Sequence, residues 1–429
     1  MPESAHPNRE QIAFTQLEQL RALLTEIFPG NRFYSEKLSA AGLTFDVASV
    51  EDFTARFPFT TKDEISADQQ THPPFGTNLS YPLERYTRYH QTSGTAGTPL
   101  RWLDTPESWD ALVDNWIEIF GAAGVAAGDR VYFAFSFGPF IGFWLAFEAA
   151  TRLGCLCVPG GGLSSVARLR AIIDNGIDTI CCTPTYALRM AEVATQEKLS
   201  LKKAKVRQII VAGEPGGSVP AVRSQITELW NGAQVFDHHG MTEVGPVTYE
   251  CPACPGVLHV LETAYLPEVI DLASSKPSGP GEAGELVLTT LTRTGSPLLR
   301  YRTGDLVKRA PHRPCVCGRY EMALEGGILG RADEMVIIRG VNVYPSAIEE
   351  IVRSSKKVAE YQVQVSTSAA LPELMLRVEP LPNCPEPRDL ARNLEQAFEI
   401  SLALRVPVQV VPIGSLPRFE MKGKRWNRV

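Results

Sequence analysis

The chain has 429 residues, more than one hydrophobic core usually organises, so two or more domains are expected. Its 42 basic and 48 acidic residues give a net charge of -6, which offers no electrostatic reason to propose nucleic acid or an anionic membrane as a partner. The N-terminal MPESAHPNREQ lacks a signal pattern, and no apolar run approaches the roughly 20 residues of a membrane span. A cytoplasmic protein is therefore expected.

The first informative segment is YHQTSGTAGTPLRW, residues 89–102. Its glycines tolerate positive φ and let the backbone approach an anion, and its hydroxyls add hydrogen-bond donors. The residues predicted to cradle phosphates are Thr92, Ser93, Gly94, Thr95 and Gly97. The loop lacks the lysine and the spacing of GxxxxGK[ST], which disfavours a Walker-type ATPase. Taken alone, it is equally well an ordinary surface turn.

Strand-like and helical patterns alternate from residue 106 to residue 243, beginning with a helical pattern over 106–124 and a strand-like run over 130–137. This alternation predicts an α/β fold with a parallel sheet. Ligands gather at the carboxyl ends of such strands, so GEPGG (213–217) and DHHGMTE (237–243) are candidates for one pocket. Beyond residue 330 the pattern predicts a small α+β unit, with strands at 359–367 and 373–381.

Eight motifs in this order resemble the acyl-CoA synthetase superfamily of adenylate-forming enzymes, and most closely its phenylacetate-CoA ligase branch. They are FPFTTKDEI with PPFG, TSGTAGTP, AGEPGG, HHGMTEVGP, GELVLTTL, PLLRYRTGDL, GRADEMVIIRGVNVYPSAIEE and LPRFEMKGKRW. The resemblance runs from about Phe53 to the end of the chain. It implies that ATP and a carboxylic acid give an acyl-adenylate and pyrophosphate, and that a thiol then displaces AMP. Such chemistry depends on positioning and on offsetting negative charge.

Lys422 matches the family's adenylation lysine, which bridges the substrate carboxylate and the α-phosphate. Lys424 is the alternative, because Met421 stands where glycine is commoner in the family. Without the resemblance, this basic cluster would be read as a solvated tail. Glu243 matches the acidic residue that helps hold Mg²⁺ at the ATP phosphates, in keeping with the oxygen ligands of that ion.

Asp305 matches the carboxylate that accepts hydrogen bonds from the ribose hydroxyls, and Asp237 would border the adenine. The further nucleotide-binding residues that the resemblance implies are Gly213, Glu214, Pro215, His238, His239, Gly240, Met241 and Thr242. His239 departs from the family pattern, which often has a tyrosine that stacks on adenine. Thr98 stands where many relatives carry lysine, which lowers the charge of the phosphate loop.

The resemblance implies a large N-terminal α/β domain, residues 1–332, and a small mobile C-terminal α+β domain, residues 333–429. Asp333 matches the hinge between them, and Arg331 matches a phosphate-contacting neighbour. Arg339 and Gly340 would line a channel for the phosphopantetheine thiol. A hinge of this kind absorbs backbone rotation at a few positions.

An acid pocket is expected to have flat or small side chains along its walls. The residues predicted to line it are Phe137, Ala212, Gly213, Gly240 and Pro246. Such walls favour an aryl or arylacetic acid over a long fatty chain or an amino acid.

Nine cysteines without a secretion signal indicate thiols or metal ligands rather than disulfides. CPACPGVLH and PCVCGR could together enclose a structural zinc ion. The favoured ligands are Cys251, His259, Cys315 and Cys317, with Cys254 as the competitor. Free thiols remain the alternative, since some members of the branch carry a similar set and others lack it.

Three functions remain open from the sequence. The first is an AMP-forming ligase that joins an aryl acid to coenzyme A. The second is a stand-alone adenylating enzyme that loads its acid onto the phosphopantetheine of a carrier protein. The third is a non-catalytic nucleotide-binding relative, against which Lys422, Glu243, Asp305 and Asp333 argue together. A homodimer fits the resemblance.

Overall fold

The computed structural model describes residues 6–92, 98–311, 314–338, 341–366, 372–382, 384, 387–420 and 422–428. They form two compact units, each built from two stretches of chain. The first unit comprises Met1–Gly161 and His238–Glu325, and the second comprises Gly162–Asp237 and Gly326–Val429. The predicted domain boundary at 332/333 stays a prediction. Within the described residues no helix is both long and apolar enough to span a membrane.

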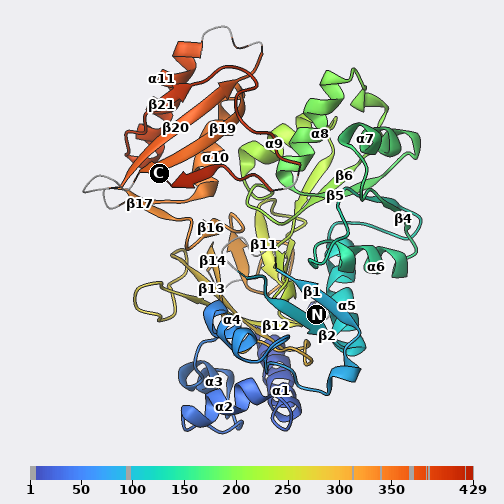
Figure 1. The fold of residues 1–429 in the computed structure, drawn as a ribbon, viewed down its shortest axis with the longest axis vertical. Helices are drawn as coiled ribbons and strands as arrows, with labels where there is room; N and C mark the ends of the chain where they lie inside the picture. Colours follow the sequence, from blue (N-terminus) through green and yellow to red (C-terminus); the bar gives the residue numbers. More distant parts are fainter. Residues whose placement is uncertain are drawn as a thin grey trace. The chain divides into compact units, whose positions relative to one another are not determined.

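The first unit combines helices with antiparallel strands (Figure 1). Its helices are α1 (Arg9–Ile27), α2 (Arg32–Ala40), α3 (Val50–Arg56), α4 (Lys62–Thr71), α5 (Pro106–Ala122) and α6 (Trp144–Arg152). Its strands are β1 (Arg88–Gln91), β2 (Arg101–Asp104), β3 (Arg130–Phe133), β4 (Leu156–Pro159), β8 (Gly240–Met241), β9 (Gly245–Pro246), β10 (Thr248–Glu250), β11 (Val257–Val260), β12 (Tyr265–Ile270), β13 (Ala283–Thr290), β14 (Tyr301–Lys308) and β15 (Ala323–Glu325).

The antiparallel strands of this unit pair in separate groups. Strands β12, β13 and β14 form a meander, β10, β11 and β15 pair through β11, and β1 and β2 form a hairpin. Strands β3 and β4 are parallel. Helix α5 confirms the helical pattern predicted from residue 106. Thr105 caps it by accepting from the Ser108 N–H, and Pro106 occupies its first turn.

The second unit contains a parallel part and a mixed sheet (Figure 1). Its helices are α7 (Ser165–Asp174), α8 (Pro184–Gln196), α9 (Pro220–Leu229), α10 (Pro345–Ser354) and α11 (Pro387–Leu402). Its strands are β5 (Thr179–Cys182), β6 (Gln208–Val211), β7 (Gln234–Asp237), β16 (Gly330–Arg331), β17 (Val336–Ile338), β18 (Val341–Val343), β19 (Val358–Ser366), β20 (Glu373–Pro380), β21 (Val408–Val410) and β22 (Trp426–Arg428).

Strands β5, β6 and β7 run parallel in that order, and α8 and α9 connect them, which confirms the predicted α/β fold. Every residue of β5 and β6 is buried, as expected of parallel strands covered on both faces.

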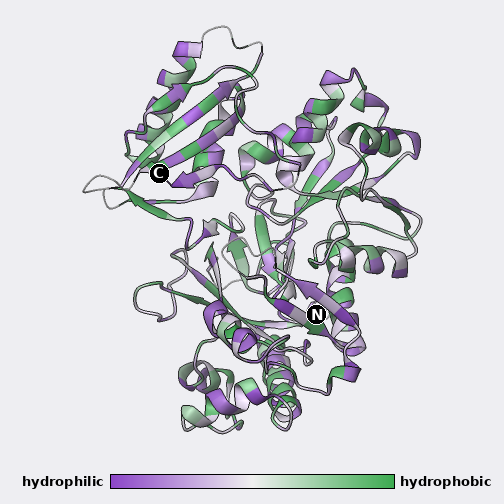
Figure 2. Ribbon diagram, in the orientation of Figure 1, coloured by the Kyte–Doolittle hydropathy of each residue, from purple (hydrophilic) through white to green (hydrophobic). Residues whose placement is uncertain are grey.

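In the mixed sheet, β19 pairs antiparallel with β20 and parallel with β22. Hydrophobic and hydrophilic residues alternate along β19 and β20 (Figure 2), which is typical of a sheet with one buried face. The buried face joins α10 and α11 in a hydrophobic core drawn from residues 336–406.

The strand predicted over 130–137 ends early, at Phe133, and the next helix, α6, begins at Trp144. Gly138, Pro139 and Gly142 explain the interval, because Gly142 has a φ of 36° and proline cannot donate to a ladder. The interval is a loop rich in aromatic residues.

Candidate active site

In the second unit, the carboxyl ends of β6 and β7 lie side by side, since Val211 pairs with Asp237 in the parallel register. Loop 213–217 follows β6 after one residue, Ala212. A Cβ on Gly217 would overlap the Asp237 carboxylate, so the loop packs closely against the end of β7. Ser218 Oγ donates to Asp237 Oδ2 at 2.5 Å. The strand ends predicted to carry ligand-binding residues therefore do meet.

Lys422 lies beside this loop. A Cβ on Gly213 would lie 3.3 Å from Lys422 Cε and 3.9 Å from its Nζ, so the lysine stem passes over the glycine. Gly213 has a φ of 96°, in the left-handed region that favours glycine. The lysine side chain is exposed. Two residues that the sequence places 209 positions apart thus meet within one unit.

Glu214 does not point into open solvent. Its Oε1 accepts from the Thr185 N–H at 2.9 Å and its Oε2 from the Gly423 N–H at 2.6 Å. Burial raises the pKa of this carboxyl, and Arg425 opposes the shift. Glu214, predicted to border the adenine, therefore also contacts the segment that carries Lys422.

In the first unit, His238 is buried against the ring of Trp116, with ring centroids 4.5 Å apart. Its Nδ1 lies 2.7 Å from the carbonyl oxygen of Thr248. Burial lowers the pKa of His238 to about 3, so the ring is neutral at physiological pH. With the proton on Nδ1 donated to the carbonyl, Nε2 carries the lone pair. His238 therefore offers no positive charge to a bound ligand.

His239 and Asp305 also lie together. His239 Nε2 is 3.2 Å from Asp305 Oδ2, and the His239 N–H donates to Thr248 Oγ1 at 2.9 Å. Asp305 lies on β14 and is buried. The residue that takes the place of the family's adenine-stacking tyrosine is thus adjacent to the residue predicted to hold the ribose.

Glu243 is buried, and its Oε1 lies 3.2 Å from Nζ of Lys62. Lys62 begins α4 and is half exposed. The backbone carbonyls of Thr242 and Glu243 both accept from Arg293 Nη1, at 2.9 and 2.8 Å. Arg293 therefore fixes the backbone of the short segment that carries Glu243, the predicted magnesium ligand.

Arg293 is itself held by Asp104 in a bidentate pair of 2.6 and 2.7 Å, and both side chains are buried. A planar guanidinium suits such a fork geometry. Asp104 ends β2, whose hairpin with β1 carries the predicted phosphate loop. Asp104 pairs with Arg88 at the open end of this hairpin, so Arg293 ties the end of the hairpin that lies away from the loop to the backbone of Glu243.

Within the phosphate loop, Ser93, Gly94, Thr95 and Gly97 lie outside the described residues, as do Arg339 and Gly340. The loop ends are described: the Thr92 N–H donates to the Leu100 carbonyl at 2.9 Å, and Thr92 Oγ1 accepts from the Leu100 N–H at 3.0 Å. Asp333 is exposed, and Arg331 Nε lies 3.2 Å from its Oδ1. Its role as a hinge stays a prediction.

Phe137 belongs to an aromatic cluster formed by the loop before α6 and by α6 itself. Its ring lies 5.6 Å from Phe135, 4.8 Å from Trp144 and 5.5 Å from Phe147, each edge to face. All four side chains are partly exposed. Gly240 and Pro246, also predicted to line the acid pocket, pair across the β8–β9 hairpin. Ala212 and Gly213 belong to the second unit.

The predicted metal ligands come together in the first unit. The ligand atoms of Cys251, His259, Cys315 and Cys317 all lie within 4.8 Å of one another. Cys251 Sγ is 3.5 Å from Cys315 Sγ, and Cys317 Sγ is 3.5 Å from His259 Nε2. Tetrahedral zinc with bonds of about 2.0–2.3 Å requires ligand separations of about 3.5–3.8 Å. The donor set therefore fits that ion.

Burial lowers the pKa of His259, which keeps its ring in the neutral form that binds metals. The ring of Tyr249 stacks on it at 5.4 Å. His259 lies on β11, and the other ligands lie in the loops beside β10 and β15, so an ion here would tie the three paired strands together. Cys254, the competitor, lies near Cys251 and Cys315.

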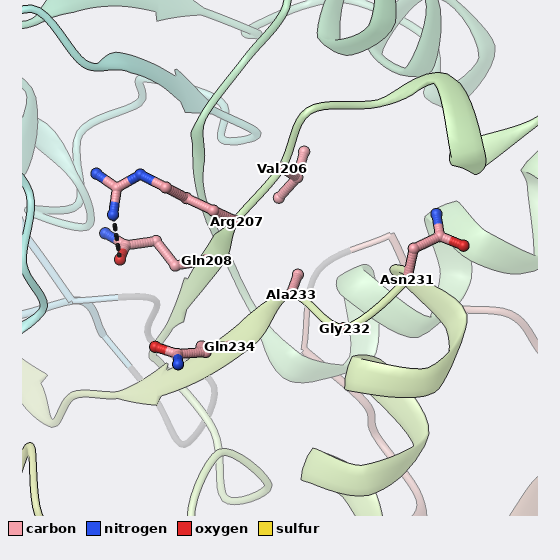
Figure 3. Close-up of a pocket in the computed structure, with 7 residues that line it drawn as sticks. All are labelled: Val206, Arg207, Gln208, Asn231, Gly232, Ala233 and Gln234. Atoms are coloured by element: carbon pink, nitrogen blue, oxygen red, sulfur yellow. Dashed lines mark hydrogen bonds between the residues drawn. The ribbon is translucent and has the colours of Figure 1, made fainter.

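A hollow in the second unit is shown in Figure 3. It is lined by Val206, Arg207, Gln208, Asn231, Gly232, Ala233 and Gln234. Gln208 and Gln234 begin β6 and β7, so the hollow is at the amino ends of the strands. Ligands of parallel sheets bind at the opposite edge.

Sequence reasoning missed Lys62, Arg293, Asp104, Thr185 and Arg425. Lys62 lies inside the FPFTTKDEI motif and could have been singled out there. The others meet their partners only through long-range contacts, which leave no local signal.

Comparisons with known proteins agree with the motifs. The AMP-binding enzyme family model matches residues 90–292, and that of the AMP-binding enzyme C-terminal domain matches residues 340–427. The phenylacetate-coenzyme A ligase of Thermus thermophilus is 34% identical over 382 residues, which cover 88% of this chain and 83% of that protein. The phenylacetate-coenzyme A ligase of Escherichia coli (strain K12) is 31% identical over 429 residues, which cover 97% of this chain and 94% of that protein.

Among solved structures, 2-hydroxyisobutyryl-CoA ligase in its postadenylation state matches with a TM-score of 0.93 and 28% identity. The match covers 98% of this chain and 90% of that one. In its thioesterification state the same ligase matches with a TM-score of 0.73, at 29% identity and the same coverage. The chain belongs to the AMP-binding family of adenylate-forming enzymes, on its phenylacetate-CoA ligase branch.

Proposed function

We propose that the chain activates an aryl or arylacetic acid. As a member of its family, it is an AMP-forming acid:CoA ligase: ATP and the acid give an acyl-adenylate and pyrophosphate, and the thiol of coenzyme A then displaces AMP. The aromatic cluster of Phe135, Phe137, Trp144 and Phe147 carries the proposal about the acid, because edge-to-face rings that are only partly covered offer an apolar wall to a flat substrate.

Lys422 is the proposed adenylation residue. A carboxylate that attacks the α-phosphate brings together two negative groups, and an ammonium between them stabilises the charge that develops in the transition state. The lysine stem passes over Gly213 at the carboxyl end of β6, the edge at which such sheets bind ligands. This position supports the assignment over that of Lys424.

Glu243 is the proposed magnesium ligand, and Mg²⁺ would neutralise the ATP phosphates. A carboxylate oxygen is the ligand that this hard cation prefers. Lys62 Nζ lies 3.2 Å from Glu243 Oε1, so this carboxylate already contacts a cation. Arg293 and Asp104 keep the backbone of Glu243 in place.

Asp305 is proposed to bind the ribose and His239 the adenine. Asp237, Gly213 and Pro215 are proposed to border the adenine. The contact between His239 and Asp305 supports the first two assignments. The ribose is joined to the adenine, so the carboxylate that binds its hydroxyls is expected next to the ring that binds the base. An imidazole offers a smaller stacking face than tyrosine does.

A structural zinc ion held by Cys251, His259, Cys315 and Cys317 is also proposed. Four protein ligands leave no open position, so the ion would stabilise the fold and take no part in the reaction. A homodimer, a cytoplasmic location and loading of a carrier protein instead of CoA are further proposals, which rest on the family resemblance.

The acid class is tested by Mg²⁺- and acid-dependent pyrophosphate release with benzoate, phenylacetate, short aliphatic, long-chain and amino acids. We expect kcat/KM for the best aryl or arylacetic acid to exceed that of the others at least about 100-fold, since a missing ring forfeits several kcal/mol of burial. Thioester formation from that acid with CoA, compared with a phosphopantetheinylated carrier protein, identifies the thiol. A preference for aliphatic or amino acids would refute the proposed acid class.

A further inference from the structure

The segment that carries Lys422 is tied to helix α8 by a buried arginine. Arg425 Nε and Nη2 donate to Glu360 Oε1 and Oε2, at 2.7 and 3.1 Å. Its Nη1 donates to Thr185 Oγ1 at 3.1 Å. The same guanidinium therefore joins strand β19 to the first turn of α8.

A second tie runs through Glu214. Its carboxylate accepts from the backbone N–H of Thr185 at 2.9 Å and from that of Gly423 at 2.6 Å. Thr185 is the second residue of α8, where N–H groups have no partner within the helix and the helix dipole favours an anion. The carboxylate thus bridges a helix N-terminus and the residue next to Lys422.

These ties set the position of the lysine. Gly423 follows Lys422, and Glu214 follows Gly213, so the bond between Gly423 and Glu214 places Lys422 over Gly213. A Cβ on Gly423 would overlap the Arg425 guanidinium and would lie 3.2 Å from Thr185 Oγ1. The backbone at Gly423 is therefore in close contact with both ties.

We propose that Thr185, Glu214 and Arg425 form a latch that positions Lys422 for adenylation. The inference rests on the proposed role of Lys422. The three are positioning residues, because they act on the reaction through the lysine segment. Hydrogen bonds to charged groups contribute more to stability than hydrogen bonds between neutral groups. A latch made of such bonds therefore holds the lysine in one place.

Thr185→Val tests the latch directly, because it removes the hydroxyl that contacts Arg425 and Glu214 and keeps the backbone N–H that Glu214 accepts from. We expect kcat for acid-dependent pyrophosphate release to fall at least about tenfold, the effect of losing a hydrogen bond to a charged group. KM for ATP and for the acid should change less than twofold. Thioester formation from preformed acyl-adenylate and CoA should stay within twofold of the unsubstituted enzyme, since it does not require Lys422.

Thr195→Val is the matched control: it is the same substitution on the same helix, where the exposed Thr195 hydroxyl donates only to the Ala191 carbonyl. It should leave both half-reactions unchanged. Gly423→Ala, which crowds Arg425, should reproduce the selective loss of adenylation. An equal fall in both half-reactions, or no fall in either, would overturn the latch.

Hydrogen exchange separates a failure of the latch from a failure of the proposed function. The Gly423 amide should exchange at least about tenfold faster in Thr185→Val than in the unsubstituted chain, and Thr195→Val should leave it unchanged. This readout needs no substrate. Unchanged exchange at Gly423 would overturn the latch even if the chain proved to be an active ligase, and an enzyme inactive with every acid would refute the function alone.

Discussion

Replacement of Lys422 by alanine is expected to lower acid-dependent pyrophosphate release about 10²–10³-fold. The lysine supplies positive charge where the acid carboxylate and the α-phosphate approach, and removal of one such group from a preorganised site typically costs this much in kcat. Because the charge is needed for adenylation only, thioester formation from synthetic acyl-adenylate and CoA should change less than threefold. Single-turnover measurements of both half-reactions check the expectation.

Lys424→Ala is the control for this prediction. Lys424 is exposed and lies two residues from Lys422 on the same segment, so it shares the charge and the surroundings of the segment. Adenylation in this variant should stay within threefold. If Lys424→Ala lost adenylation and Lys422→Ala kept it, the assignment would pass to Lys424.

Zinc removal is expected to have the largest effect on stability. Purified protein should contain about one zinc ion per chain, and Cys315→Ser or prolonged chelation should remove it. The three thiolates and the imidazole, whose ligand atoms lie within 4.8 Å of one another, would then lose the cation that binds them. Strands β10, β11 and β15 would no longer be linked through the metal. We expect Tm to fall by at least about 5 °C, since 1 kcal/mol is worth about 2–4 °C in a domain of 150–250 residues.

Cys254→Ser distinguishes the two possible ligand sets. The geometry favours the set with His259, so this variant should keep its zinc and lose less than about 2 °C. Loss of zinc in Cys254→Ser with retention in His259→Ala would reverse the assignment. Absence of zinc from the purified protein, together with an unchanged Tm in Cys315→Ser, would refute the site.

The local pattern of the sequence predicted elements whose cause is local. Helix α5 follows from its cap at Thr105, from Pro106 and from its apolar spacing. Strands β6 and β7 follow from short apolar runs, and their parallel pairing then places loop 213–217 beside Asp237. The loop before α6 was misread because its phenylalanines continue the apolar pattern, while Gly138, Pro139 and Gly142 break the backbone.

The contacts that hold the site in place could not be predicted in this way. Arg293 and Asp104 are 189 positions apart, and either would pass as a solvated charge in the sequence. Without the family resemblance, Arg425 would pass as part of a solvated basic tail, yet it is buried against Glu360 and Thr185. Buried charges of this kind depend on long-range pairing, which neither periodicity nor composition encodes.

The resemblance to a family supplied what the local patterns could not. It assigned Lys422 to a site with residues near position 213, and the structure brings Lys422 beside Gly213. It also drew attention to the histidines, but the neutral state of His238 follows only from its burial and its bond to Thr248.

The products of ATP cleavage test the central claim most directly. The purified chain with ATP, Mg²⁺, CoA and the best acid of the panel should form AMP, pyrophosphate and acyl-CoA in equal amounts, and without CoA it should form enzyme-bound acyl-adenylate. Formation of ADP and inorganic phosphate, or of a thioester without AMP, would contradict an adenylate-forming ligase.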